Sequence, residues 1–201
     1  MFLVEDDEPL RRATTRLLSS HGFGVREFAS AEEFLGAVGP EDRGCLLLDL
    51  RLPGASGLEL QQRLVERSLS TPVVFLTGHA DVPTSVYAMK RGAVDFLEKP
   101  AREADLVAAL ERALVRDESS RKEHGELAEL ERRYAELTPR EREVLTSVVG
   151  GQRNKQTARA LGIAERTVKL HRSRVLQKMR AASLAELVRM AERLGLRSPG
   201  A

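Results

Sequence analysis

Four acidic residues in this chain follow short apolar runs. The run FLV leads into Glu5, Asp6 and Asp7, and the run CLLL leads into Asp49. If these acids meet in the fold, they repel one another unless a cation lies between them. Mg²⁺, or Mn²⁺, is a hard cation that prefers such oxygen ligands and keeps part of its hydration shell. The acids therefore predict a divalent-metal site.

Two further polar residues end apolar runs in the same way. Thr77 ends the run PVVFLT, and Lys99 ends AVDFLEK. An ammonium group suits a phosphoryl oxygen, and a hydroxyl group can donate a hydrogen bond to a second one. Together with a metal ion, these residues favour transfer of a phosphoryl group to the Asp49 carboxylate.

Apolar runs and amphipathic segments alternate five times across residues 1–115. The apolar runs predict strands, and apolar residues at intervals of three and four predict a helix after each strand. Such alternation indicates a doubly wound parallel sheet, in which ligands bind beyond the carboxyl ends of the strands. In the flavodoxin-like strand order 2-1-3-4-5, strands one and three are neighbours, which would bring Glu5, Asp6 and Asp49 together.

The charge distribution divides the chain into three parts. Lys and Arg number 13 against 18 Asp and Glu in residues 1–115, 5 against 7 in residues 116–137, and 14 against 5 in residues 138–201. We expect an acidic domain over residues 1–115, a helical linker over 116–137 and a basic domain over 138–201. The excess of positive charge in the last part makes a polyanion its candidate partner.

An apolar stripe runs along the expected linker, where Leu127, Leu130, Tyr134 and Leu137 recur at intervals of three and four residues. Two interpretations stay open. The segment is a solvated helical connector with one face against a neighbouring domain, or it is a short seam between two copies of the chain. One and a half heptads are too few to hold two helices together alone.

Residues 138–201 predict four helices and no strand. On a helical wheel of residues 164–179, Val168, Val175 and Met179 share one face, which we expect to be buried. The opposite face is basic but includes Leu170. In a DNA major groove Leu170 could meet a thymine methyl group, while Lys169 could reach guanine or phosphate. The other candidate DNA contacts are Thr157, Arg166, Thr167, His171, Ser173 and Arg174.

Composition excludes several classes of protein. No apolar run approaches the length of a membrane span, and no secretory signal opens the chain. The single cysteine, Cys45, lies in an apolar run, which indicates a core residue in a reducing compartment. We therefore expect a cytoplasmic protein without a membrane partner.

Several of these segments resemble known families. VEDDEP, LLLDLRLPGASG, VVFLTGHAD and AVDFLEKP resemble the receiver domain of bacterial two-component response regulators, over roughly residues 1–115. LTPREREVL and NKQTARALGIAERTVKLHRSRVLQKM resemble the helix-turn-helix domain of the LuxR/FixJ/NarL branch, over about residues 137–196. The resemblance implies a receiver domain followed by an all-α, four-helix DNA-binding domain.

The receiver resemblance also implies a role for each site residue. Asp49 would be the phosphoacceptor. Glu5 and Asp6 would be the acidic pair, and the backbone carbonyl of Arg51 would complete the protein ligands of Mg²⁺. The remaining roles are the switch hydroxyl, the switch aromatic and the phosphate-binding lysine, at Thr77, Phe96 and Lys99, with a cis Lys99–Pro100 peptide bond.

The implied function is phosphorylation-dependent regulation of transcription rather than enzymatic turnover. A sensor histidine kinase would donate the phosphoryl group, and the phosphorylated protein would form a homodimer, bind promoter DNA and contact RNA polymerase. Two alternatives stay open: a phosphotransferase whose C-terminal helices bind a protein partner, and a DNA-binding regulator that does not need phosphorylation.

Arg51 and His79 each lie two residues beyond a site residue, Asp49 and Thr77 respectively. There they would flank the path of an attacking water molecule. We expect them either to tune the lifetime of the phosphorylated state or to be solvated residues at the rim of the site.

Overall fold

The computed structural model describes residues 1–78 and 81–196. The chain forms two compact units, Met1–Arg121 and Lys122–Ala201. Within the described residues, no helix is both long enough and apolar enough to cross a membrane.

The first unit contains a parallel sheet of five strands, β1 (Phe2–Val4), β2 (Arg26–Phe28), β3 (Leu46–Leu48), β4 (Val73–Thr77) and β5 (Asp95–Glu98). Their order is β2-β1-β3-β4-β5, which confirms the predicted topology. In the register of β1 and β3, Val4 pairs with Leu48. Glu5 and Asp49, each one residue further along, therefore leave the sheet side by side at its carboxyl edge.

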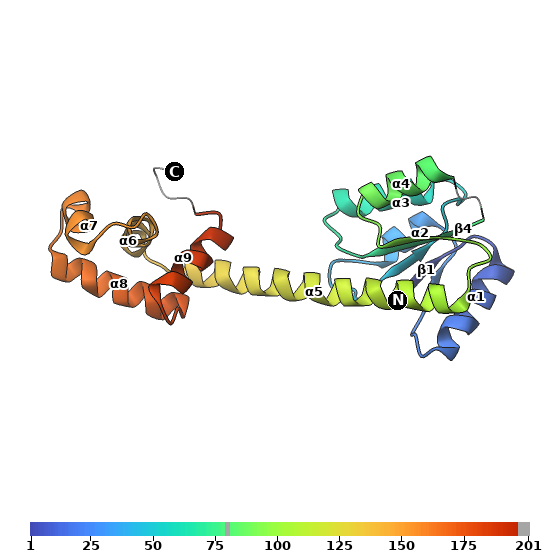
Figure 1. Ribbon diagram of the computed structural model, residues 1–201, viewed down its shortest axis with the longest axis horizontal. Coiled ribbons are helices and arrows are strands. Elements are labelled where there is room, and N and C mark those ends of the chain that lie inside the picture. Colours follow the sequence, from blue (N-terminus) through green and yellow to red (C-terminus); the bar gives the residue numbers. More distant parts are fainter. Residues whose placement is uncertain (79–80, 197–201) are drawn as a thin grey trace. The chain divides into compact units, whose positions relative to one another are not determined.

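Helices cover both faces of this sheet (Figure 1). On one face lie α2 (Ala31–Ala37), α3 (Gly57–Glu66) and α4 (Val82–Lys90), and on the other α1 (Glu8–Ser20) and α5 (Glu103–Ala135). Because strand side chains alternate between faces, Leu46 and Leu48 join the core under α2, α3 and α4, whereas Leu47 joins the core under α1 and α5. Cys45 is fully buried in the second core, as predicted.

Helix α5 is longer than the sequence suggested and runs through most of the expected linker. The segment holds no proline, and its one glycine, Gly125, costs only about 1 kcal/mol in a helix interior, so nothing in it stops the helix. Asp117 is 7% exposed and accepts hydrogen bonds from the backbone N–H of Gly44 at 3.0 Å and from Arg121 Nε at 2.9 Å. Arg121 also donates from Nη2 to the Asp42 carbonyl, so α5 is fastened to the first unit as far as Arg121.

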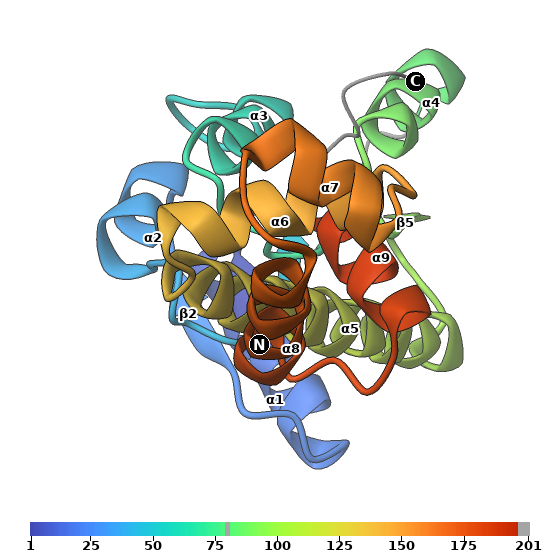
Figure 2. The same cartoon turned by 90° about the vertical axis from the view of Figure 1, so that its left-hand side faces the viewer.

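The second unit packs α6 (Pro139–Val149), α7 (Asn154–Leu161), α8 (Glu165–Met179) and α9 (Leu184–Arg193) around one core (Figure 2). Thr138 and Glu141 form a capping box at the start of α6. Gly162, at a φ of 64°, ends α7 and allows the sharp turn into α8. The four predicted helices are therefore present.

The apolar stripe of the linker belongs to the second unit. Leu130 and Leu137 are 4% and 3% exposed in its core, and Tyr134 packs against the same core. The connector interpretation is thus confirmed, because one face of the segment packs on its neighbouring domain. Leu130 and Leu137 are not available for a seam between two copies, because they are already buried within one chain.

Candidate functional site

Three charged side chains meet beyond the carboxyl edge of the sheet. Lys99, one residue after β5, donates from Nζ to Glu5 Oε2 at 2.6 Å and to Asp49 Oδ2 at 2.5 Å. Glu5 is 4% exposed and Asp49 9% exposed. The structure therefore places two buried carboxylates around a single ammonium group.

The surroundings shift the pKa values of this cluster. Burial raises the pKa of the Glu5 carboxyl above its ordinary value, and the nearby Asp49 charge adds to that rise, while Lys99 partly opposes it. For Lys99, burial lowers the pKa, but the bonds to Asp49 and Glu5 outweigh burial and leave it raised. Two acids share one cation, so the pocket favours additional positive charge.

The three consecutive acids have different surroundings. Asp7 caps α1 by accepting from the backbone N–H of Leu10 at 2.8 Å. Glu5 is held by Lys99. Asp6 is exposed, and within the described residues its carboxylate makes no hydrogen bond or ion pair. Asp6 is therefore the acid that remains available to a ligand.

The donor set fits Mg²⁺, although it is sparse. Among residues 1–78 and 81–196, no three Asp, Glu, His or Cys side chains gather closely enough to hold a metal ion by themselves. Asp6, Asp49 and one backbone carbonyl would leave the other positions to water and phosphoryl oxygens. Mg²⁺ is commonly bound in this way, through one or two carboxylates and retained waters.

The loop after β3 fixes Asp49. Its Oδ1 accepts from the backbone N–H of Arg51 at 3.0 Å, and the Arg51 side chain is exposed. Gly57 opens α3 against this loop, and a Cβ atom there would lie 2.3 Å from the Asp49 carbonyl oxygen. The sequence did not single out Gly57, because a Ser-Gly pair marks only a helix start.

Thr77 is the last residue of β4, and Phe96 lies on β5 two residues before Glu98, which pairs with Thr77. Thr77 is fully buried, and its carbonyl accepts from the Lys99 backbone N–H at 2.8 Å. Phe96 is partly buried, with its ring centroid 5.7 Å from that of Phe75, and lines a groove with Val82 of α4. The Lys99–Pro100 bond is cis, as predicted. His79 lies outside the described residues.

In the second unit, α8 buries the face that the helical wheel predicts. Val168, Val175 and Met179 are at most 1% exposed. Leu170 is 50% exposed, and the Lys169 side chain is 67% exposed, with Nζ 3.9 Å from Glu165 Oε1. The other exposed candidates on α8 are Arg166, Ser173 and Arg174.

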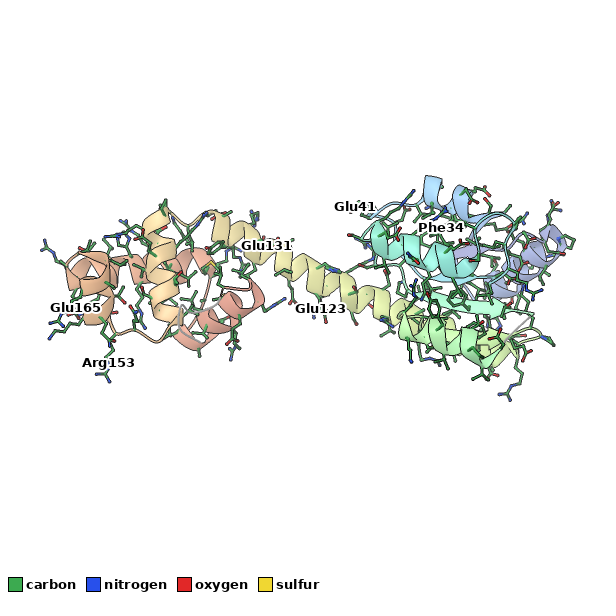
Figure 3. The ribbon with its side chains drawn as sticks, turned by 90° about the horizontal axis from the view of Figure 1, so that it is seen from above. Phe34, Glu41, Glu123, Glu131, Arg153 and Glu165 are labelled. Atoms are coloured by element: carbon green, nitrogen blue, oxygen red, sulfur yellow. The ribbon has the colours of Figure 1, made fainter. Side chains whose placement is uncertain are left out.

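The starts of α7 and α8 lie at the same end of the second unit. Arg153, at the start of α7, and Glu165, at the start of α8, project from this end (Figure 3). Arg172 links the two helices, donating from Nη1 to Asn154 Oδ1 at 3.1 Å. A basic surface on α8 therefore rests on a braced helix-turn-helix.

One predicted DNA contact is wrong. Thr157 is fully buried in α7, and its hydroxyl has no hydrogen-bond partner among the described residues. The side chain faces the core and cannot reach a phosphate group. Thr167 and His171 are partly buried, and the Nδ1 atom of His171 is enclosed without a partner in the described structure.

Comparison with known families agrees with this geometry. Residues 1–111 match the response regulator receiver domain, and residues 135–191 match the bacterial regulatory proteins of the luxR family. The chain belongs to the response regulators. Its relatives include Nodulation protein W of Bradyrhizobium diazoefficiens, which is 47% identical over 98% of this chain and 86% of that protein.

Other response regulators match over nearly the whole chain as well. The transcriptional regulatory protein FixJ of Azorhizobium caulinodans is 46% identical over 95% of this chain and 90% of that protein. The solved structure of the response regulator StyR superposes with a TM-score of 0.83 at 45% identity, covering 96% of this chain and 97% of StyR. The predicted architecture, a receiver domain followed by a LuxR-type helical domain, is confirmed.

Proposed function

We propose that Asp49 accepts a phosphoryl group from a sensor histidine kinase and that phosphorylation controls dimerisation and promoter binding. The observation that carries this proposal is the Lys99 ammonium group between Glu5 and Asp49, at 2.6 Å and 2.5 Å. The Lys99 ammonium group lies beside the Asp49 carboxylate, which β3 and the loop after it hold in place. A phosphoryl group entering there would exchange contacts with water for contacts with Lys99.

We infer that Mg²⁺, or Mn²⁺, binds beside Asp49 through Asp6, Asp49 and the Arg51 carbonyl. When bound, the metal supplies positive charge at the oxygens of the transferring group. The chain's own residues do the rest. Asp49 provides the nucleophilic oxygen, Lys99 binds a phosphoryl oxygen, and Glu5 holds Lys99 in place through its buried carboxylate.

The switch joins this site to α4. A phosphoryl group on Asp49 offers strong acceptor oxygens to the Thr77 hydroxyl. Movement of Thr77 toward them would leave room for Phe96 to turn inward from the groove that it lines with Val82. To raise the active conformation from 1% to 99% of the protein, phosphorylation must stabilise it relative to the inactive conformation by about 5.5 kcal/mol.

Helix α4 offers an apolar surface for the dimer. Val82 is 75% exposed, Val86 and Tyr87 are each 45% exposed, and Met89 is 44% exposed. An apolar cluster on one short surface helix typically marks a contact with a partner. We therefore assign the homodimer surface to α4 together with β5 and the first part of α5.

The second domain would bind promoter DNA through α8. Leu170 would face base edges, Lys169 would reach guanine or phosphate, and Arg166, Ser173 and Arg174 would lie near the sugar-phosphate backbone. RNA polymerase is the expected further partner on the promoter, and a cytoplasmic location follows from these partners. The excess of basic residues beyond residue 137 favours this function over a phosphotransferase with a protein-binding module.

The test compares the wild-type chain with D49N. Both are treated with acetyl phosphate and Mg²⁺, resolved by phosphate-affinity electrophoresis and sized by light scattering. We expect a phosphorylated dimer that protects promoter DNA only for the wild type. Normal dimerisation of D49N after the same treatment would refute the proposal.

A further inference from the structure

A partly buried arginine holds the loop that carries the acidic pair. Arg11 lies on α1, and its side chain is 15% exposed. Its Nη1 donates to the carbonyl of Glu5 at 2.7 Å and to the carbonyl of Asp6 at 3.2 Å. Its Nε lies 3.7 Å from Glu27 Oε2, on β2.

The neighbours of Asp6 have other bonds, but Asp6 itself depends on Arg11. The backbone N–H of Glu5 donates to the Phe28 carbonyl at 3.2 Å, and the Asp7 carbonyl accepts from the Arg11 backbone N–H at 2.8 Å. Within the described residues, Arg11 supplies the one hydrogen bond to the Asp6 backbone. The Asp6 main chain is therefore held by a side chain five residues further along the chain.

We propose that Arg11 is a positioning residue, which fixes the Asp6 main chain and so presents the Asp6 carboxylate to a divalent cation beside Asp49. The inference rests on the proposed function, because it assigns Arg11 to the same metal site. A planar guanidinium group is suited to the task, since two carbonyl groups can share its donors in a fixed geometry. Metal ligands held by such outer contacts lose about 10-fold to 100-fold in metal affinity when the contact is removed.

Positioning and charge predict opposite effects when Arg11 is replaced. Arg11 carries positive charge near the site, so its removal alone would make divalent cations bind more tightly. Its removal as a positioning residue would make them bind more weakly, because the Asp6 carboxylate would lose its orientation. The sign of the change therefore separates the two roles.

The test measures Mn²⁺ binding to the full chain by electron paramagnetic resonance, in which the signal of free Mn²⁺ falls as the ion binds. The variants are R11Q, R11K and, as a matched control, R12Q. Arg12 is the next residue on α1, its side chain is 67% exposed, and it pairs with Glu8 one helical turn away. Circular dichroism melts establish that each variant is folded.

We expect R11Q to weaken Mn²⁺ binding about 10-fold, R11K to fall between R11Q and the wild type, and R12Q to match the wild type. R11Q binding as tightly as R12Q, or more tightly, would overturn the inference. If R11Q does not fold, the Mn²⁺ affinity of R11K is the test, and an affinity equal to that of the wild type overturns the inference.

D6N separates this inference from the proposed function. If D6N binds Mn²⁺ as tightly as the wild type, both the metal site and the role of Arg11 are overturned. If D6N loses Mn²⁺ binding while R11Q keeps it, only the role of Arg11 is overturned.

Discussion

Replacing Lys99 with methionine tests the electrostatics of the site most directly. The variant keeps the length of the side chain but removes the one ammonium group between Glu5 and Asp49. The Glu5 and Asp49 side chains are 6% and 10% exposed, so water replaces Lys99 poorly. In the absence of metal, one of the acids must then take up a proton or the pocket must open.

The size and sign of the effect follow from proton linkage. Burial already raises the pKa of Glu5, and loss of Lys99 raises it further, above the value of about 4.3 in the unfolded chain. Between the pKa of Glu5 in the unfolded chain and its higher pKa in the folded variant, the folded state binds more protons than the unfolded state. The free energy of unfolding therefore falls as the pH rises through this range, by up to about 1.4 kcal/mol per pH unit. Removing one partner of a buried ion pair typically costs about 3 kcal/mol, and we expect this loss in full only above the raised pKa of Glu5.

Hydrogen exchange of the β1 and β3 amides reports unfolding of the first unit separately from the second. We would measure it between pH 5 and pH 7.5 with EDTA present, correct for the intrinsic exchange rates, and use K90M as the matched control. Lys90 is an exposed residue at the end of α4. We expect K99M to be destabilised relative to K90M by about 3 kcal/mol at pH 7.5 and by little at pH 5. A difference between the two variants that does not change with pH would refute this account of the cluster.

Three further predictions concern other parts of the chain. G57A should lower the rate of phosphorylation by acetyl phosphate and destabilise the first unit by about 1–3 kcal/mol, because its Cβ would lie 2.3 Å from the Asp49 carbonyl oxygen. The control is G36A, whose Cβ would enter open space on α2 and should have neither effect. Equal behaviour of G57A and G36A would contradict the close approach at Gly57. T157V should stabilise the second unit by about 1 kcal/mol, since it removes a buried hydroxyl without a partner among the described residues. A melting temperature below that of the wild type in calorimetry would show that the hydroxyl is hydrogen-bonded. Fluorescence anisotropy with a promoter fragment tests α8. K169A should reduce the slope of log affinity against log salt concentration by about 1, while L170A should weaken specific binding without changing that slope. Unchanged DNA binding by both variants would show that α8 is not part of the interface.

The sequence alone determined the elements and most of their order. Five apolar runs, each followed by an amphipathic segment, are sufficient to predict a parallel sheet, because hydrophobic periodicity is a local property of the chain. The same holds for α8, where one helical wheel separates Val168 and Val175 from the exposed Leu170. The position of Asp49 at the end of a buried run likewise predicts a presented carboxylate, and β3 places it there.

Only the tertiary structure decided which side chains share a contact. Nothing in the letters EDD shows that Asp7 caps α1 while the Asp6 carboxylate has no partner among the described residues, since this depends on how the loop leaves β1. Arg11 and Gly57 act on backbone carbonyls, which carry no sequence signal. Thr157 looked like a surface hydroxyl and proved to be buried, because packing between helices overrides the polarity of one small side chain. Periodicity fixes which face of an element is apolar, but the partner of that face is set by residues far away in the chain.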